Sequence, residues 1–576
     1  MAYLATTALD KFWDKTADEI VFLGEWCKTN SDSKDLQNYK TMPFLWSNQE
    51  IVKTAFDECW AVYYAILPIL SKHLNEIHNI NKSDRYWKII IGNWLWCFIQ
   101  IVYDRYKNIN NFIAEYPNFN TFVLSKNSYI TPLEYGDFIN NISSDPYNLQ
   151  LYSQILDYLG FNFRALDYNL NQRHVYKYGH KSLFKNTLFR FIEFFAKKDA
   201  CITITTPNFI NKMSFIKLFF NSDRKIIYDD FNDLISIDIK KDITMRNNFT
   251  RLYGGNNDFI KLLFYLFEQN FPMLFLEGFM DMRKNALSRS NRLTKVYFTT
   301  NAVYFNYPYK FFIAEHIEQI LFVGMQHGGN YGSDNSFNGD KYEIDISDYF
   351  LTWGWKYGID TKPCTYEMIN QNIKPKKDGY ILFVMNDMLK YLYRIESFYQ
   401  SSAIKLAYLP KTISFFRNVK AIDKFLVRTY PSDSGFKIAQ TLKDNFPSMI
   451  FDNHSKTFRK RLKNARLFVC DHLSTTYLEA MAMNFPTIVF ANKNYCSFRR
   501  PELFELLIEA KILFYDEIEA AKHIDMIYNN IDDWWLSYSV QKARREFCYH
   551  YARTSDDWAK EYMKVFNNIL ENDARS

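Results

Sequence analysis

The segment at residues 467–490 constrains the fold of this chain more than any other stretch. It opens with the apolar run 467–470, which is long enough for one buried strand of a parallel sheet. Ser474 is a favourable N-cap for a helix that Pro486 then stops, and residues 487–490 are typical of a second strand. The helix is predicted from apolar side chains that recur on one face, namely Leu478, Met481, Ala482 and Phe485. The segment is therefore predicted to form a strand–helix–strand unit.

Hydroxyl groups gather at the start of this predicted helix. Ser474, Thr475 and Thr476 lie where the first backbone N–H groups of a helix have no partner within it. Hydroxyl and N–H donors at such a position suit a phosphate group. Glu479, about one turn further along, is placed to accept hydrogen bonds from a ribose. The alternative is an ordinary helix of a Rossmann-like domain whose hydroxyls only cap its end.

The totals for the chain narrow the class of protein. Its 576 residues exceed one ordinary core, so two large domains or more are expected. A net charge of +6 is mild; it permits an anionic substrate or membrane surface and does not indicate a nucleic-acid partner. The eight cysteines include no CxxC pair, which favours a reducing cytoplasm. No signal sequence begins the chain and the most apolar segment, 89–103, is too short to span a bilayer, so a soluble protein is predicted.

The first predicted strand, at 19–23, is followed by Gly24 and Glu25. Open α/β sheets place their ligands at the carboxyl ends of parallel strands. Glu25 is therefore a candidate general base, and the alternative is an ordinary exposed loop acid. Asp104, in the predicted helical region 48–115, is a second candidate for the same role.

A glycine pair follows another predicted strand, at 321–325. Gly328 and Gly329 allow the backbone to approach a ligand closely. His327 stands immediately before them, at the carboxyl edge of the sheet and not on one of its faces. This setting favours a catalytic or binding histidine, although a single histidine is more often structural.

Residues 479–486 read E-A-x-A-x-N-x-P and resemble the E-A-x-A-x-G-x-P segment of GT-B glycosyltransferases, in which the Glu holds the nucleotide ribose. Asn484 replaces the usual Gly at a helix end, where Asn also tolerates a left-handed backbone. The hydroxyls at 474–476 resemble the serine motif with which capsule Kdo transferases and polysialyltransferases hold the CMP phosphate. Those enzymes carry a His-Pro pair where this chain has Tyr430 before a proline, so that Arg428 would supply the positive charge.

Several motifs, taken in order, resemble a bacterial family associated with surface-polysaccharide transfer; they are FLGEWC, the stretch RYW…GNWL…YDRY, MQHGGNYG, SDYFLTWGW, RTYP and STTYLEA. The resemblance implies an α/β, GT-B-like fold with two Rossmann-like domains, a cleft between them, and an N-terminal domain enlarged by helical insertions. The acceptor-side domain would cover 1–354 and the nucleotide-sugar domain 355–535. Helices at 536–576 would return to pack on the first domain.

The resemblance also implies an activity. A glycosyltransferase of this kind moves an acidic sugar, either Kdo-like or a nonulosonic acid such as pseudaminic, legionaminic or sialic acid, from a CMP-activated donor. The acceptor would be a bacterial surface glycan or a lipid-linked glycan, reached from the cytoplasm or from the inner face of the membrane. No cofactor and no metal are expected. The implied catalytic residues are His327, Glu25 and Asp104, and the implied donor-binding residues are Gly328, Gly329, Arg428, Tyr430, Ser474, Thr475, Thr476 and Glu479.

Two other functions stay open at this point. A CDP-polyol phosphotransferase of the teichoic-acid type also uses a cytidine nucleotide and a His-Gly loop. A non-catalytic, GT-B-like binding subunit of a polysaccharide assembly complex would keep the fold without turnover. The fate of the phosphate separates the first alternative from a glycosyltransferase, and retention of the donor without turnover would indicate the second.

Overall fold

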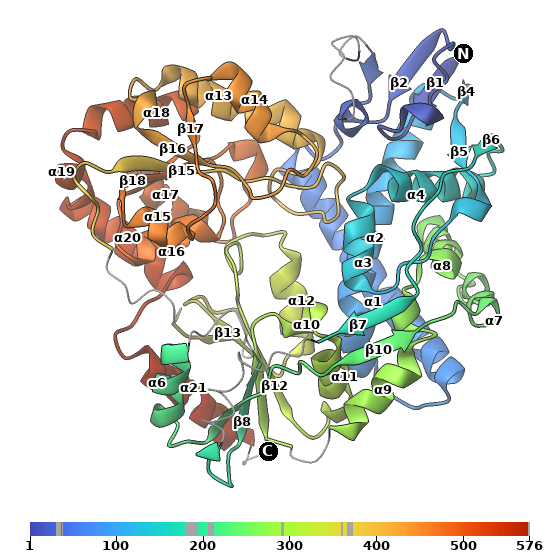
Figure 1. Ribbon diagram of the computed structural model, residues 1–576, viewed down its shortest axis with the longest axis horizontal. Coiled ribbons are helices and arrows are strands. Elements are labelled where there is room, and N and C mark those ends of the chain that lie inside the picture. The colour runs from blue at the N-terminus through green and yellow to red at the C-terminus, as the bar shows by residue number, and fades with distance from the viewer. Residues whose placement is uncertain are drawn as a thin grey trace.

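The computed structural model describes residues 1–29, 36, 39–179, 194–205, 212–289, 293–358, 361–365 and 373–573. Two six-stranded parallel sheets form its centre, in the orders β9-β8-β11-β12-β13-β14 and β17-β16-β15-β18-β19-β20 (Figure 1). The strands of the first sheet are β8 Ile202–Thr205, β9 Ile226–Tyr228, β11 Val296–Thr299, β12 Leu321–Met325, β13 Tyr349–Thr352 and β14 Thr361–Pro363. Those of the second are β15 Tyr380–Val384, β16 Phe425–Arg428, β17 Ile450–Phe451, β18 Ala465–Cys470, β19 Thr487–Phe490 and β20 Leu513–Phe514.

Helices surround the sheets and build a lobe beside them (Figure 1). The elements before β14 include α1 Gln49–His78, α2 Asp84–Glu115, α3 Tyr135–Ile142, α4 Asp145–Tyr158, α6 Lys212–Asn221, α7 Ile243–Arg246, α8 Asp258–Asn270, α9 Phe279–Ser288, α10 Ala302–Phe305, α11 Tyr307–His316 and α12 Asn338–Ile346. Those after β15 include α13 Leu409–Asn418, α14 Ile438–Asn445, α15 Phe458–Leu462, α16 Thr475–Ala482, α17 Pro501–Glu509, α18 Glu517–Ile527, α19 Ile531–Trp535, α20 Tyr538–Tyr551 and α21 Trp558–Asp573.

The predicted strand–helix–strand unit is confirmed as β18, α16 and β19. Strand β18 is buried on both faces, which explains its unbroken apolar run. Leu467 and Val469 pack in one hydrophobic cluster, and Phe468 and Cys470 pack in another on the opposite face. Asn484 adopts the left-handed backbone expected at the helix end, with φ of 54°. This unit fixes the position of the α16 N-terminus at the carboxyl edge of the second sheet.

The predicted helical region at 48–115 forms α1 and α2, which begin at side-chain caps. Asn48 accepts a hydrogen bond from the Glu50 amide, and Ser83 accepts one from the Tyr86 amide. The apolar segment 89–103 is buried throughout inside α2, so its composition reflects the core of the helical lobe. Among the residues that the structure describes, no helix has both the length and the hydropathy needed to cross a membrane.

The strand predicted at 19–23 forms as β2 (Glu19–Phe22), but it belongs to a separate small sheet. This parallel sheet has the order β3-β2-β1-β4 and lies at the end of the helical lobe, away from both six-stranded sheets (Figure 1). The remaining strands are β1 Ala2–Ala5, β3 Lys40–Thr41, β4 Phe119–Asn120, β5 Phe122–Leu124, β6 Arg164–Leu166, β7 Val175–Tyr178 and β10 Ile235–Asp238. The chain around Glu25 is therefore not part of the sheet that carries His327.

The closing helices link the two halves of the molecule. Helix α20 contacts α16 and α17, whereas α21 contacts α6 beside the first sheet (Figure 1). Tyr562 and Phe566 of α21 lie 6.4 and 5.4 Å, centroid to centroid, from the ring of Phe298 on β11. Strand β14 pairs with β13, so the first sheet extends past residue 354, where the sequence analysis ended the first domain. The other domain limits stay predictions.

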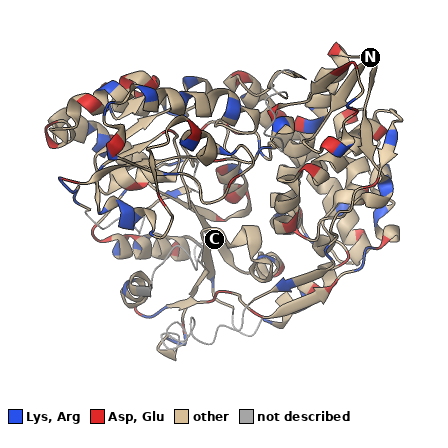
Figure 2. Ribbon diagram, turned by 45° about the horizontal axis from the view of Figure 1, so that its top comes forward, with Lys and Arg blue, Asp and Glu red and all other residues tan. Residues whose placement is uncertain are grey.

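Charged residues of both signs are mixed along both halves of the molecule (Figure 2). Some of them join the helical lobe to the first sheet. Lys88 of α2 pairs with Asp345 of α12 at 2.8 Å, and Arg85 pairs with Asp348 just before β13 at 2.9 Å. Partly exposed pairs such as these add little stability each.

Candidate active site

A cavity of about 670 Å³ lies between the two six-stranded sheets. Its lining includes residues that follow β11, β12, β15, β18 and β19 within one or two positions, so the carboxyl edges of both sheets face it. The strand order of the second sheet changes direction between β15 and β18. Open α/β sheets bind ligands at such a point. Asn386 after β15 and His472 after β18 both line the cavity there.

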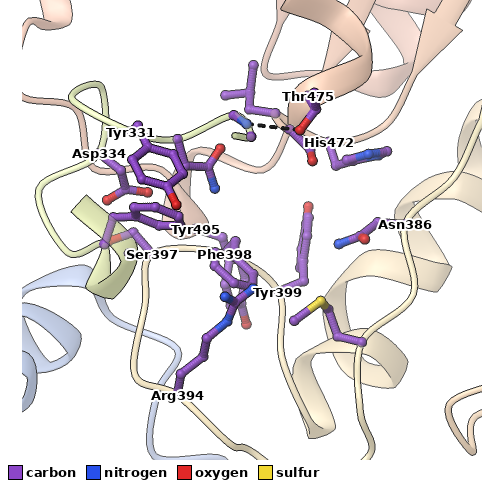
Figure 3. Close-up of a pocket in the computed structure, with 18 of the residues that line it drawn as sticks. Tyr331, Asp334, Asn386, Arg394, Ser397, Phe398, Tyr399, His472, Thr475 and Tyr495 are labelled. Carbon is purple, nitrogen blue, oxygen red and sulfur yellow. Dashed lines mark hydrogen bonds between the residues drawn. The ribbon is translucent and has the colours of Figure 1, made fainter. Parts of the chain in front are cut away.

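The glycine loop after β12 touches the start of α16. The Gly329 amide donates a hydrogen bond of 2.9 Å to the Thr475 hydroxyl, which joins the two halves at the cavity wall (Figure 3). A Cβ atom on Gly329 would lie 2.5 Å from the carbonyl carbon of Ser474, so only glycine fits there. Ser474 occupies the N-cap position of α16 but makes no capping hydrogen bond with its side chain.

His327 lies on the cavity wall against a buried carboxylate. Its Nδ1 is 3.1 Å from the Tyr331 hydroxyl and 3.6 Å from Glu343 Oε2. Tyr331 donates to Glu343 Oε1 at 2.5 Å, and Tyr304 donates to the same oxygen at 2.8 Å. The imidazole is 29% exposed, whereas the Glu343 side chain is 3% exposed. Glu343 and the Tyr331 hydroxyl therefore hold the imidazole from behind and orient it.

The two tyrosines of this cluster stay protonated. Burial, and then the charge of Glu343, raise the pKa of Tyr304 and of Tyr331 well above its usual value. Both hydroxyls consequently remain donors to the carboxylate over the physiological pH range. Sequence reasoning missed Glu343, because no spacing rule links residue 343 on α12 to His327.

A second histidine in the cavity also has a buried carboxylate partner. His472 Nδ1 is 3.1 Å from Asp471 Oδ1, which also accepts a hydrogen bond of 2.8 Å from Tyr408. Thr412 donates to the other carboxylate oxygen at 2.9 Å. Because a carboxylate only accepts hydrogen bonds, Nδ1 carries the proton in this pair, and in the neutral imidazole Nε2 is then the acceptor. Neither Asp471 nor His472 is among the site residues predicted from the sequence.

The structure brings part of the predicted donor site together. The residues that line the cavity are His327, Gly328, Gly329, Tyr430, Ser474 and Thr475. Arg428 lies outside this lining, because its guanidinium binds Asp452 and the Lys456 carbonyl oxygen. Glu479 also lies outside, and its Oε1 accepts two hydrogen bonds from Arg459, at 2.6 and 3.0 Å. Thr476 is in the first turn of α16 but is not part of the lining. A ribose-binding role for Glu479 stays a prediction.

The two candidate bases, Glu25 and Asp104, are not brought to the cavity. Glu25 is buried and forms ion pairs with Lys28 at 2.9 Å and with Lys405 at 3.3 Å. Asp104 is also buried, and it accepts hydrogen bonds of 2.6 Å from Trp46 and of 2.6 Å from Arg105. Both carboxylates are thus held by donors within the fold, and the structure does not support either as the general base.

Asp387, which follows β15, is an unusual carboxyl group of the cavity lining. Its Oδ2 accepts a hydrogen bond of 2.9 Å from the Ser434 amide, while its buried Oδ1 has no hydrogen-bond partner among the described residues. Burial raises the pKa of Asp387 from 3.8 to about 6. The group therefore titrates close to physiological pH.

The stability of the variant Asp387→Asn, measured relative to the wild type, is expected to increase as the pH rises from about 4 to 7, because the wild type loses stability over this range. The folded protein holds the Asp387 proton more tightly than the unfolded chain does, so wild-type stability falls between pH 3.8 and about 6. This pKa shift corresponds to a loss of about 3 kcal/mol in the free energy of unfolding of the wild type. Asparagine does not titrate, so the variant does not show this loss. Melting temperatures of both proteins across this range provide the measurement. A pH-independent difference between them would contradict the raised pKa.

The described part of the chain contains no group of three or more His, Cys, Asp and Glu side chains that is arranged to hold a metal ion. Metal independence stays a prediction.

The fold and the cavity together define a two-domain α/β protein of GT-B-like architecture with its site between the domains. The chain belongs to the LIC12162 family of transferases, whose model matches residues 2–566. This match confirms that the chain is a transferase, the broad activity that the resemblance implied, and the CMP-activated donor and the acidic sugar stay predictions.

Similarity to solved structures is low. The O-GlcNAc transferase of Thermobaculum terrenum is 10% identical at a TM-score of 0.35, covering 89% of this chain and 98% of its own. The UDP-GlcNAc 2-epimerase of Methanocaldococcus jannaschii is 9% identical at a TM-score of 0.31, covering 64% and 99%. UGT2 of Phytolacca americana is 9% identical at 0.30, covering 65% and 100%. Likeness at this level carries no conclusion about activity. A comparison with curated proteins finds no match.

Proposed function

We propose that this transferase is a glycosyltransferase that moves an acidic sugar from a CMP-activated donor to a surface glycan or lipid-linked acceptor. The observation that carries the proposal is the contact between the His327 loop and the N-terminus of α16, at the wall of an interdomain cavity. Glycosyl transfer needs groups that stabilise a departing phosphate and groups that position an acceptor hydroxyl. Both kinds of group line this cavity.

The leaving phosphate is assigned to the start of α16. Backbone N–H groups there and the hydroxyls of Ser474 and Thr475 are donors for an anion. His327, which Glu343 and Tyr331 hold from behind, hydrogen-bonds or protonates the phosphate as the bond to the anomeric carbon breaks. The electron pair of that bond leaves with the phosphate oxygen.

The proton of the acceptor hydroxyl needs a base. His472 replaces Glu25 and Asp104 as the candidate, because it lines the cavity and Asp471 holds its Nδ1 proton. Its Nε2 is then free to take the proton as the acceptor oxygen attacks the anomeric carbon. The resulting imidazolium is stabilised by the Asp471 carboxylate, as in other His–carboxylate pairs.

Nucleotide choice provides the first test. CMP is expected to raise the melting temperature of the intact protein more than UDP or GDP does at equal concentration, since binding to the folded state alone stabilises it by about 2.7 kcal/mol at one hundred times Kd. A larger shift with UDP or GDP would contradict the CMP donor. Product analysis with a CMP-activated acidic sugar then separates the activities: phosphate retained on CMP supports glycosyl transfer, and phosphate found on the acceptor indicates a phosphotransferase.

A further inference from the structure

Arg394 is the one Lys or Arg among the described residues that line the cavity. It lies on the segment between β15 and α13, and its side chain reaches toward the middle of the lining (Figure 3). The side chain is 26% exposed. A permanent positive charge is thus presented to a cavity that is otherwise lined mainly by aromatic and neutral polar groups.

The guanidinium of Arg394 is held in place from several sides. Its Nε is 3.0 Å from Oε2 of Glu396, and the guanidinium carbon lies 4.8 Å from the Tyr393 ring centroid and 5.0 Å from that of Phe398. Glu396 is fixed in turn, because its Oε1 accepts hydrogen bonds from the Asn338 amide at 2.9 Å and from Asn338 Nδ2 at 3.1 Å. The cation is therefore preorganised by the fold.

The donors of Arg394 are nevertheless left unused. Within the described residues, neither Nη1 nor Nη2 has a hydrogen-bond partner, and Nε and Glu396 Oε2 form an ion pair without hydrogen-bond geometry. Burial acts to lower the pKa of Arg394, but the charge of Glu396 outweighs it and the pKa is raised, so the group stays positive. The buried Nε is an exception to the rule that buried polar groups are hydrogen-bonded, and the two Nη groups are donors that a ligand in the cavity can use.

We infer that Arg394 is the receptor for an anionic oxygen group, a carboxylate or a phosphate, of the ligand that occupies the interdomain cavity. The planar fork of a guanidinium matches both groups with two parallel hydrogen bonds. Arg428, which the sequence analysis assigned to this role, is already bound to Asp452. The inference deepens the proposed function and rests on it for the identity of the ligand.

Two separate features of the cavity favour negative charge. In Figure 3, Arg394 and Thr475 at the start of α16 lie on opposite sides of the lining. A ligand with two anionic groups, such as a nucleotide joined to an acidic sugar, uses both. Asp334 also lines the cavity, but it does not repel an anionic ligand. Burial raises the pKa of Asp334 well above its usual value and favours the neutral acid.

The test compares charged probes with their neutral counterparts by calorimetric titration of the intact protein. One pair is CMP and cytidine, and the other is N-acetylneuraminate and its methyl ester. The wild type is expected to prefer the charged member of at least one pair by about tenfold or more, in the range of a charged hydrogen bond. Arg394→Gln is expected to reduce that preference to about threefold or less, and Arg394→Lys to retain part of it. The pair that responds identifies the group as phosphate or carboxylate.

A second variant serves as a control for loss of stability. Removal of Arg394 alone leaves Glu396 buried without its partner, which destabilises proteins. The double variant Arg394→Gln with Glu396→Gln removes both charges and is expected to show the same loss of preference. Arg500→Gln, an exposed arginine on another part of the surface, is the matched control and is expected to keep the wild-type preference.

The test of Arg394 can be distinguished from the test of the proposed CMP donor. If UMP or GMP binds in place of CMP, the proposed donor is wrong, and the same comparison with uridine or guanosine still tests Arg394. Preferences that are unchanged in the folded Arg394→Gln and double variants overturn the inference. A wild type that binds no charged probe more tightly than its neutral counterpart overturns it as well.

Discussion

His327→Ala is expected to lower turnover with a CMP-activated sugar by about 10²-fold or more, the range for acid–base and oxyanion-stabilising groups. The melting temperature and the affinity for CMP should change little. The reason is that the contribution of this imidazole grows as negative charge develops on the leaving phosphate, and this happens only in the transition state. The imidazole is also partly exposed, so its removal leaves no large cavity in a packed core.

Melting temperature, CMP affinity and turnover are measured on one preparation of the variant. His550→Ala, which changes a histidine on α20 away from the cavity, is the matched control and should keep wild-type turnover. Glu343→Gln adds a test of positioning, because it keeps the shape of the side chain and removes the charge behind His327. Near-normal turnover of His327→Ala, or a loss of stability large enough to explain the lost activity, would refute the catalytic role.

Local signals account for the parts of the fold that the sequence predicts. The unit at 467–490 is recognisable because its apolar run, its helical spacing and its proline all act within a few residues. The strand at 19–23 is also recognisable, yet its partner strands are not, since pairing depends on distant segments. The strand before Glu25 is therefore predicted correctly, but it belongs to a different sheet from those that line the cavity. The rule about carboxyl ends of strands applies only when the right sheet is known.

The residues of the candidate site likewise divide into those that a local sequence signal marks and those whose role depends on distant contacts. His327 and the glycines after it are predictable, because a strand end and a close backbone approach leave a local signature. Glu343 and Arg394 carry no such signature. Glu343 acquires its role from Tyr304 and Tyr331, and Arg394 acquires its role from a cavity that distant segments of the chain build together. Arg428 was expected at the donor site, and it lies outside the cavity lining because a distant residue binds it. Nothing local reveals that Asp452, on a different strand connection, already binds its guanidinium.

Gly329→Ala is expected to reduce turnover by about 10- to 100-fold, because a misplacement of about 1 Å in a catalytic arrangement costs up to about 10²-fold. The added Cβ would lie 2.5 Å from the Ser474 carbonyl carbon and 2.8 Å from the Thr475 amide nitrogen. These are backbone atoms, so no side-chain rotation relieves the contact. The loop and the start of α16 must separate, which lengthens the hydrogen bond between Gly329 and Thr475. His327 and the phosphate-binding end of α16 are then displaced from each other.

Gly328→Ala is the control that isolates this contact, since both variants add one methyl group to the same loop. Its Cβ would meet Thr475 Oγ1 at 3.5 Å, an ordinary contact, and neither glycine has a positive φ that alanine would strain. Its loss of turnover should therefore be a few-fold at most. Turnover and CMP affinity of the two variants are compared with the wild type. Two results would contradict this prediction: Gly329→Ala retains wild-type turnover and CMP affinity, or the two variants lose turnover equally. In either case the close contact between the loop and α16 is not the arrangement in which the enzyme acts. The roles assigned to His327 and to the start of α16 would then both be wrong.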